Sequence, residues 1–117
     1  FIRFTAINPS SAHSCSCDMC QKHTGCHTAV WIEFDSADVE WTAEGGAPSL
    51  FRSSAASSRA FCARCGTSVG AIDDSHVTAL LSGIFDNNQR DLFSPSSHSF
   101  QDMKPEWWRI IMPDIAQ

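Results

Sequence analysis

A chain of 117 residues is long enough for one domain, and its 43 % apolar residues can fill an ordinary hydrophobic core. Thirteen acidic against eight basic residues give a formal charge of −5, which argues against a nucleic-acid partner because phosphate backbones need a concentrated basic face. No apolar run approaches the roughly 20 residues that span a bilayer, so no membrane partner is expected.

The N-terminal part of the sequence predicts one strand and the one plausible helix. The chain begins on Phe1, not Met, and residues 1–7 read as a strand already in progress, so we expect further residues upstream. Residues 18–24 predict a short helix, with Asp18 as its cap and Gly25 ending it.

Most of the remaining sequence reads as short strands separated by turn residues. Apolar and polar side chains alternate along several of these stretches, which is the period of a half-buried strand. Residues 53–58 and 73–74 predict hairpin turns, and residues 85–95 are polar and rich in structure breakers, so they predict a loop. About eight or nine short strands imply a mainly β fold, an antiparallel sandwich or open barrel. Besides residues 1–7, strands are expected at residues 27–34, 37–42, 49–53, 67–72, 76–83 and 107–112.

Six cysteines, five of them in two tight clusters, are the most informative residues of the chain. Thiolates two or three residues apart can converge on one small cation, and zinc accepts such soft ligands without redox chemistry. Disulfides of a secreted domain and inert buried thiols are the alternatives, but adjacent cysteine knuckles make a poor disulfide framework. We therefore predict zinc. The predicted ligands are Cys15, Cys17, Cys20, Cys62 and Cys65, while Cys26 stands alone.

The first cluster, Cys-x-Cys-x-x-Cys at residues 15–20, supplies three ligands. A structural zinc site has four protein ligands, whereas a catalytic site leaves one position for water or substrate. The sequence leaves both possibilities open. Three thiolates around an open zinc would favour exchange of a thiol ligand over hydrolysis. Side chains close enough in sequence to close the site instead are His13, His23, Cys26 and His27.

The second cluster supplies only two ligands, Cys62 and Cys65, followed by Gly66. A structural zinc site needs two more. Cys17 and Cys20 could supply them in a zinc ribbon with a long insert, or they could come from residues upstream of the chain.

Three other kinds of residue have a simple interpretation. Arg52 and Arg59 read as solvated strand-edge residues, although a guanidinium can also clamp a carboxylate. His98 reads as a histidine whose hydrogen bonds are satisfied at the start of a strand. Trp107 and Trp108 are expected to line the core, or one of them a pocket.

Residues 14–25, Ser-Cys-Ser-Cys-Asp-Met-Cys-Gln-Lys-His-Thr-Gly, resemble the Cys-His-Cys-Ser-x-Cys-Arg-Lys-x-Thr-Gly signature of the glutathione-dependent formaldehyde-activating enzyme (GFA) family. Trp31, residues 51–54, Arg59 and residues 61–67 are similar to its later blocks. A weaker C-terminal pattern matches residues 83–86, His98 and one of Trp107 and Trp108. The resemblance covers nearly the whole chain.

The resemblance implies a β-tent of antiparallel sheets with zinc knuckles and two zinc ions. The structural zinc would take Cys62 and Cys65 plus a Cys-x-Cys just before the first strand, and the active zinc would take the Cys15, Cys17 and Cys20 sulfurs. That N-terminal Cys-x-Cys is absent here. Residues 1–117 are therefore expected to be a single GFA-like zinc-binding domain without this segment.

Two functional hypotheses follow. One is a zinc-dependent carbon–sulfur lyase-like enzyme acting on a thiol/aldehyde adduct, with glutathione as the thiol that the resemblance implies and an S-hydroxymethyl group as the adduct. The alternative is a non-catalytic, zinc-stabilised binding module. With no leader segment in the chain, we expect a cytoplasmic protein, monomeric or homodimeric. The fourth ligand of the first zinc distinguishes the two hypotheses.

Overall fold

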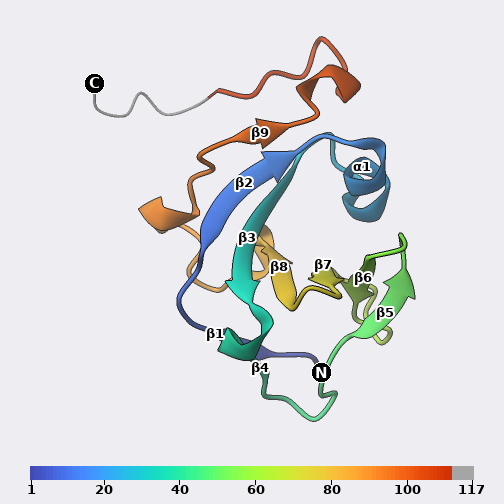
Figure 1. The fold of residues 1–117 in the computed structure, drawn as a ribbon, viewed down its shortest axis with the longest axis vertical. Helices are drawn as coiled ribbons and strands as arrows, with labels where there is room; N and C mark the ends of the chain where they lie inside the picture. The colour runs from blue at the N-terminus through green and yellow to red at the C-terminus, as the bar shows by residue number, and fades with distance from the viewer. Residues whose placement is uncertain (112–117) are drawn as a thin grey trace.

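A computed structural model describes residues 1–111 of the chain. Within these residues it contains nine strands, one α-helix and four short 3-10 turns. No helix in this part of the chain is long and apolar enough to cross a membrane. The elements are β1 (Phe4–Ala6), β2 (Ser11–Cys15), α1 (Asp18–Thr24), β3 (Ala29–Asp35), β4 (Val39–Trp41), β5 (Ser49–Arg52), β6 (Ser57–Phe61), β7 (Ser68–Asp73), β8 (Val77–Leu81) and β9 (His98–Ser99) (Figure 1).

The strands form two sheets. The larger has the order β5-β6-β7-β8-β3-β2-β9, and the smaller pairs β1 with β4. Figure 1 shows β2 and β3 as a long curved hairpin, with α1 beside the end of β2. The predicted mainly β fold with one short helix is confirmed. One pair departs from the antiparallel pattern, because β9 runs parallel to β2, with Ser14 opposite His98.

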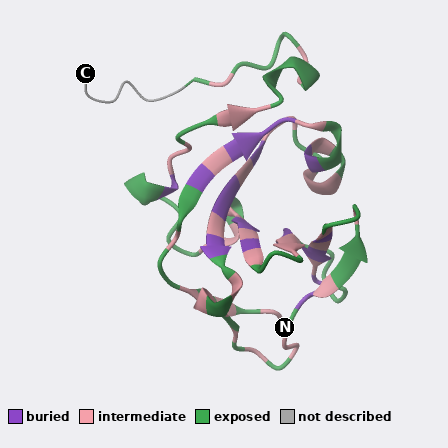
Figure 2. Ribbon diagram, viewed as in Figure 1, coloured by how far each residue is buried: buried purple, intermediate pink, exposed green. Residues whose placement is uncertain are grey.

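Strand β3 lies in the interior of the larger sheet, and both of its faces are buried. Ile32 and Phe34 point into the main core, where they are 0 % and 2 % exposed. Ala29 and Trp31 point to the other face and pack in a second buried cluster with cysteine side chains. Figure 2 shows buried residues concentrated along β2 and β3. The thiols therefore sit on the reverse side of the strand that holds the main core.

Helix α1 has the predicted bounds, Asp18–Thr24, but its cap is a different residue. Its cap is Cys17, whose backbone is extended and whose sulfur accepts a hydrogen bond from the Cys20 N–H at 3.4 Å. The prediction of Asp18 as the cap is wrong, and Asp18 lies in the first turn, where a carboxylate suits the positive end of the helix dipole. Gly25 ends the helix as predicted, in the left-handed conformation with φ of 75°.

The structure corrects further expectations, and β6 and β9 were not among the predicted strands. Strand β2 was not predicted, because its sequence Ser-Ala-His-Ser-Cys lacks a strong apolar alternation. The strand expected at residues 107–112 is wrong for residues 107–111, which form no strand, and residue 112 lies outside the described residues. Trp107 is 72 % exposed and Trp108 is 40 % exposed, so neither belongs to the core.

Gly70, in β7, lies where a side chain cannot fit. A Cβ atom there would be 2.2 Å from the backbone oxygen of Ala79 on the neighbouring strand β8. We expect Gly70→Ala to lower the free energy of unfolding by about 3 kcal/mol, the upper range for overpacking a core, because backbone must move. Urea denaturation measures this loss. Gly83→Ala is the matched control, since no atom lies within 4 Å of its Cβ position, and equal losses in the two variants would contradict the expectation.

Candidate metal centre

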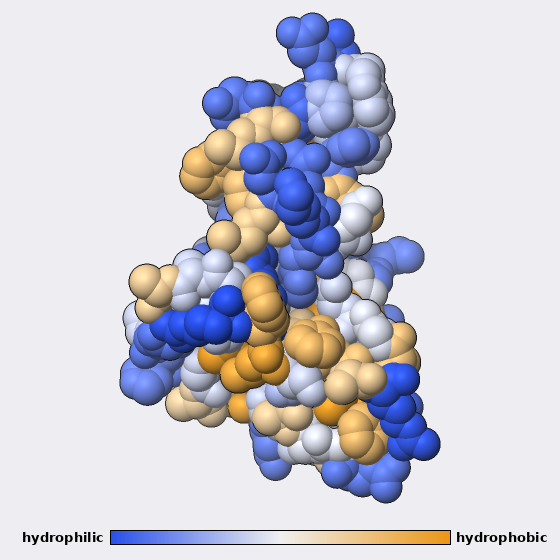
Figure 3. Space-filling view, turned by 90° about the vertical axis from the view of Figure 1, so that its right-hand side faces the viewer, coloured by the Kyte–Doolittle hydropathy of each residue, from blue (hydrophilic) through white to orange (hydrophobic). Residues whose placement is uncertain are grey.

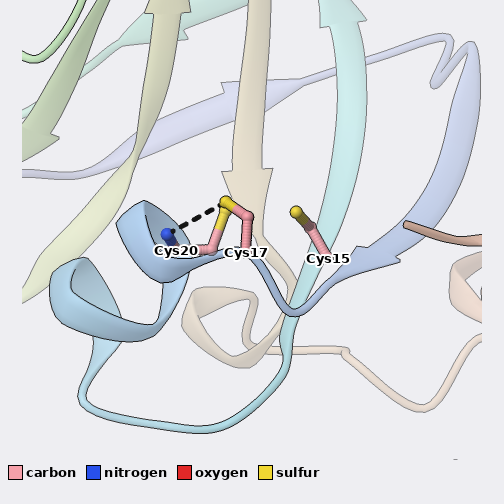
Figure 4. Close-up of side chains that lie close together, drawn as sticks. All are labelled: Cys15, Cys17 and Cys20. Carbon is pink, nitrogen blue, oxygen red and sulfur yellow. Dashed lines mark hydrogen bonds between the residues drawn. The ribbon is translucent and has the colours of Figure 1, made fainter. Parts of the chain in front are cut away.

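Three thiols from the first cysteine motif meet where β2 passes into α1. Cys15 is the last residue of β2, Cys17 caps α1, and Cys20 lies in its first turn. Their three sulfur atoms all lie within 4.8 Å of one another. Figure 4 shows the Cys17 and Cys20 side chains side by side, with the Cys15 sulfur directed toward them. We call Cys15, Cys17 and Cys20 the thiol cluster.

The backbone around the thiol cluster is held by hydrogen bonds to two other segments. The fully buried Ser16 hydroxyl lies 2.9 Å from the Thr28 hydroxyl, in the segment before β3. Gln21 donates from its side-chain amide to the Ser16 carbonyl at 2.8 Å and to the Met103 carbonyl at 3.1 Å. The loop that carries the sulfurs is therefore fixed before any ligand binds.

Burial sets the protonation of the cluster. It raises the pKa of the Cys15 thiol to about 12 and also raises that of Cys20, although Arg59 acts against the second effect. Burial opposes ionisation of Cys17 as well, but hydrogen bonds from the Cys20 backbone N–H and from the other two thiols outweigh it, and its pKa is lowered. Buried thiols of this kind become thiolates together only when a cation compensates their charge.

The donor set fits zinc. Zinc–sulfur bonds of about 2.3 Å in a tetrahedron place sulfur atoms about 3.8 Å apart, a spacing that sulfurs within 4.8 Å of one another can reach with small side-chain rotations. Three sulfurs and no oxygen donor also match a soft-ligand site rather than a magnesium or calcium site.

Arg59, on β6, is the one cation in contact with the thiol cluster among the described residues. Its two terminal nitrogens donate to the Cys20 sulfur at 3.7 and 3.8 Å, and its guanidinium lies 5.3 Å from the centre of the Trp31 ring. The expectation of a solvated strand-edge arginine is wrong, because β6 is an interior strand between β5 and β7. Arg52, on the edge strand β5, fits that expectation, since it is exposed and pairs with Asp74 at 2.6 Å.

The chain is similar to known proteins in both sequence and fold. Residues 1–103 match the family described as glutathione-dependent formaldehyde-activating enzyme. The chain belongs to this family. A crystal structure of a Rhodobacter sphaeroides protein has a similar fold, with a TM-score of 0.60 and 20 % identity over 83 % of this chain and 89 % of that chain. The comparison with curated proteins finds no match.

In this member of the GFA family, none of the four side chains considered as a fourth ligand joins the cluster. Within residues 1–111, no further His, Cys, Asp or Glu donor lies within 4.8 Å of all three sulfurs. His13 faces Glu33 at 3.4 Å, and His23 stacks parallel to Trp31 with ring centres 6.2 Å apart. Cys26 is exposed, and the His27 ring packs against Trp107 and Trp108 at 4.8 and 5.8 Å.

The second cysteine pair lies apart from the thiol cluster. No group of described donors combines Cys62 and Cys65 with Cys17 and Cys20, so the structure does not show the zinc ribbon. Gly66 turns the knuckle with φ of 80°, and its N–H donates to the Cys62 carbonyl at 2.7 Å. A hydrogen bond with Thr67 lowers the pKa of the Cys65 thiol to about 7.

The N-terminal segment lies beside this knuckle. Phe1, Ile2 and Phe4 line one cavity of about 340 Å³ together with Cys62 and Cys65. The N-terminal segment and the Cys62–Cys65 knuckle therefore face the same cavity.

The remaining candidates lie near the thiol cluster without joining it. His98 begins β9, and its Nδ1 is hydrogen-bonded to the Ser14 hydroxyl, which fits the expected satisfied histidine. Trp108 donates from its indole nitrogen to the Thr28 hydroxyl at 2.8 Å. The same hydroxyl is hydrogen-bonded to Ser16, so Trp108 stabilises the segment before β3 that contacts the cluster loop. These tryptophans support the loop rather than fill the core.

Proposed function

We propose that the protein is a zinc-dependent carbon–sulfur lyase-like enzyme that acts on the adduct of a thiol and an aldehyde. Glutathione and formaldehyde are the pair that membership of the GFA family suggests. The observation that carries the proposal is the thiol cluster, with three converging sulfurs and no fourth protein donor among the described residues. Zinc bound there would leave one position at which a substrate sulfur is stabilised as thiolate.

The reaction needs stabilisation of a leaving sulfur. When an S-hydroxymethyl thiol decomposes, its carbon–sulfur bond breaks, the electron pair stays on sulfur, and the hydroxyl proton is lost as the carbonyl forms. A site that favours thiolate lowers the free energy of that departure, and the reverse addition gains from the same site. Soft-ligand exchange at sulfur suits this chemistry better than activation of water does.

The chain's own residues prepare this site in two ways. Three thiolates would give their zinc complex a charge of −1, which the Arg59 guanidinium at 3.7 Å from Cys20 offsets. Trp31, 3 % exposed, covers one side of the arginine and keeps water from the charge pair. The buried Ser16 loop holds the sulfurs in place, so little reorganisation accompanies binding.

We also propose that Cys62 and Cys65 hold a second, structural zinc together with donors from the N-terminal side, since that segment lines the same cavity. The protein would then carry one or two zinc ions according to whether those donors are present. A reducing cytoplasm is the compartment in which such thiols stay free to bind metal. As a monomer or homodimer, the protein would have the same thiol cluster in each chain.

The test is exchange spectroscopy on a mixture of glutathione and formaldehyde, because the adduct also forms without a catalyst. We expect the zinc-loaded protein to speed the exchange between glutathione and its S-hydroxymethyl adduct in proportion to protein concentration. The zinc-free protein should leave the exchange at its spontaneous rate. Thiol binding with no acceleration would contradict the enzyme and support the non-catalytic binding module.

A further inference from the structure

A cavity of about 510 Å³ lies between α1 and the β5–β6 end of the larger sheet. Its volume falls within the range of about 300–1,000 Å³ for small-molecule sites. Figure 3 faces this side of the molecule and shows apolar surface next to strongly hydrophilic residues. Its walls include Met19, Lys22, His23, Phe51, Arg59 and Phe61.

The charges in this cavity differ from those of the whole chain. The protein has a formal charge of −5, yet the cavity is lined by two cations, Lys22 and Arg59, and by no aspartate or glutamate. Lys22 forms no ion pair with any residue in the described part of the chain. Burial and the neighbouring Arg59 lower the pKa of His23, so its ring is neutral. The cavity therefore favours an anionic ligand.

The cavity and the thiol cluster share Arg59. Its guanidinium lines the cavity and also donates to the Cys20 sulfur, so one side chain contacts both the cavity and the thiol cluster. Met19, Lys22 and His23 occupy successive positions i, i+3 and i+4 on one face of α1, the helix that also carries Cys20. Arg59 therefore connects the thiol cluster to the cavity directly.

We propose that this cavity is the carboxylate subsite of the thiol substrate, with Lys22 and the free donors of Arg59 binding a carboxylate while the substrate sulfur lies at the thiol cluster. This inference rests on the proposed function and assigns the residues that select an acidic thiol over an uncharged one. Apolar walls from Met19, Phe51 and Phe61 fit the aliphatic parts between such groups. Arginine has five N–H donors, so two directed at sulfur leave others for a carboxylate.

Calorimetric titration of the zinc-loaded protein tests the subsite with two probes, glutathione and its diethyl ester, which keeps the thiol but lacks both carboxylate charges. We expect glutathione to bind about tenfold more tightly than the ester, as a charged hydrogen bond in a partly enclosed site provides. Lys22→Gln should weaken glutathione binding about fivefold, the upper range for an exposed ion pair, and leave ester binding unchanged.

Arg90→Gln is the matched control, because it removes one positive charge from a residue that lines a different cavity. It should change neither affinity, which separates a local contact from the effect of net charge. Arg59→Lys should weaken glutathione binding more than ester binding. If Arg59→Lys loses stability, Lys22→Gln still tests the subsite independently.

The outcomes separate the two proposals. If both probes bind equally well and Lys22→Gln changes neither affinity, the subsite is overturned while the thiol site and the proposed function stand. If neither thiol binds the zinc-loaded protein, the proposed function fails and the subsite fails with it.

Discussion

Replacing Cys17 with serine is expected to weaken zinc binding by about hundredfold. A four-ligand zinc site contributes about 10–16 kcal/mol, so one thiolate accounts for about 3 kcal/mol, and each 1.4 kcal/mol is a factor of about ten. Cys17 is the sulfur nearest solvent in the cluster, and it caps α1, where a serine hydroxyl is also a good cap. The substitution therefore removes a ligand without removing the helix. Competition with a chromophoric chelator measures the affinity.

Cys26→Ser is the control for this measurement. Cys26 follows the same helix, but it is exposed and lies outside the group of converging sulfurs. It should bind zinc as the unchanged protein does. Equal affinities in Cys17→Ser and Cys26→Ser would show that the thiol cluster holds no metal. Cys62→Ser should instead lower the stability of the fold and leave zinc at the thiol cluster.

The thiol cluster could be predicted because everything that forms it is local. Cys17 and Cys20 lie three residues apart at the start of a short helix, and Gly25 fixes where that helix ends. Only Ser16 separates Cys15 from Cys17. Spacing alone therefore brings the three sulfurs together, and most strands followed from alternation of the same short range.

Arg59 could not be placed from the sequence for the opposite reason. Its alternation in β6 shows that it shares a face with Ser57 and Phe61, but not that this face lies toward α1. That depends on how the larger sheet curves and on which element covers it. The sequence offered only the alternative that its guanidinium could clamp a carboxylate, which does not lead to a thiol contact.

Strand pairing explains two of the errors in the strand assignment, at β2 and at residues 107–111. β2 has little intrinsic preference for a strand, yet it pairs with β3 on one side and β9 on the other, which satisfies its backbone on both edges. Residues 107–111 are far more apolar but pair with no strand of the described sheets, and the edge of β2 is already taken by β9. Pairing with neighbouring strands decided both assignments, and a local sequence pattern does not show which strands pair.

Phe34→Ala is expected to lower the free energy of unfolding by about 3–5 kcal/mol, the cost of truncating a buried aromatic side chain. Phe34 is 2 % exposed, and its ring stacks with Phe85 at 6.1 Å between centres. Phe85 in turn packs edge to face with Phe93 at 4.7 Å, and Phe93 is 4 % exposed. These two rings come from residues 85–95, which were predicted as a polar loop, so one substitution removes support from both segments.

Leu50→Ala is the control, since Leu50 lies on the edge strand β5 and is 54 % exposed. It should change stability by less than about 0.5 kcal/mol. Urea denaturation of the zinc-loaded variants compares the two, and similar small losses would mean that the loop rings do not depend on β3. Because Phe34 and the thiol cluster lie on opposite faces of β3, zinc affinity measured below the unfolding transition should stay unchanged in Phe34→Ala. Core packing around Phe34 then sets the free energy of unfolding, and the thiol cluster alone sets the affinity for zinc.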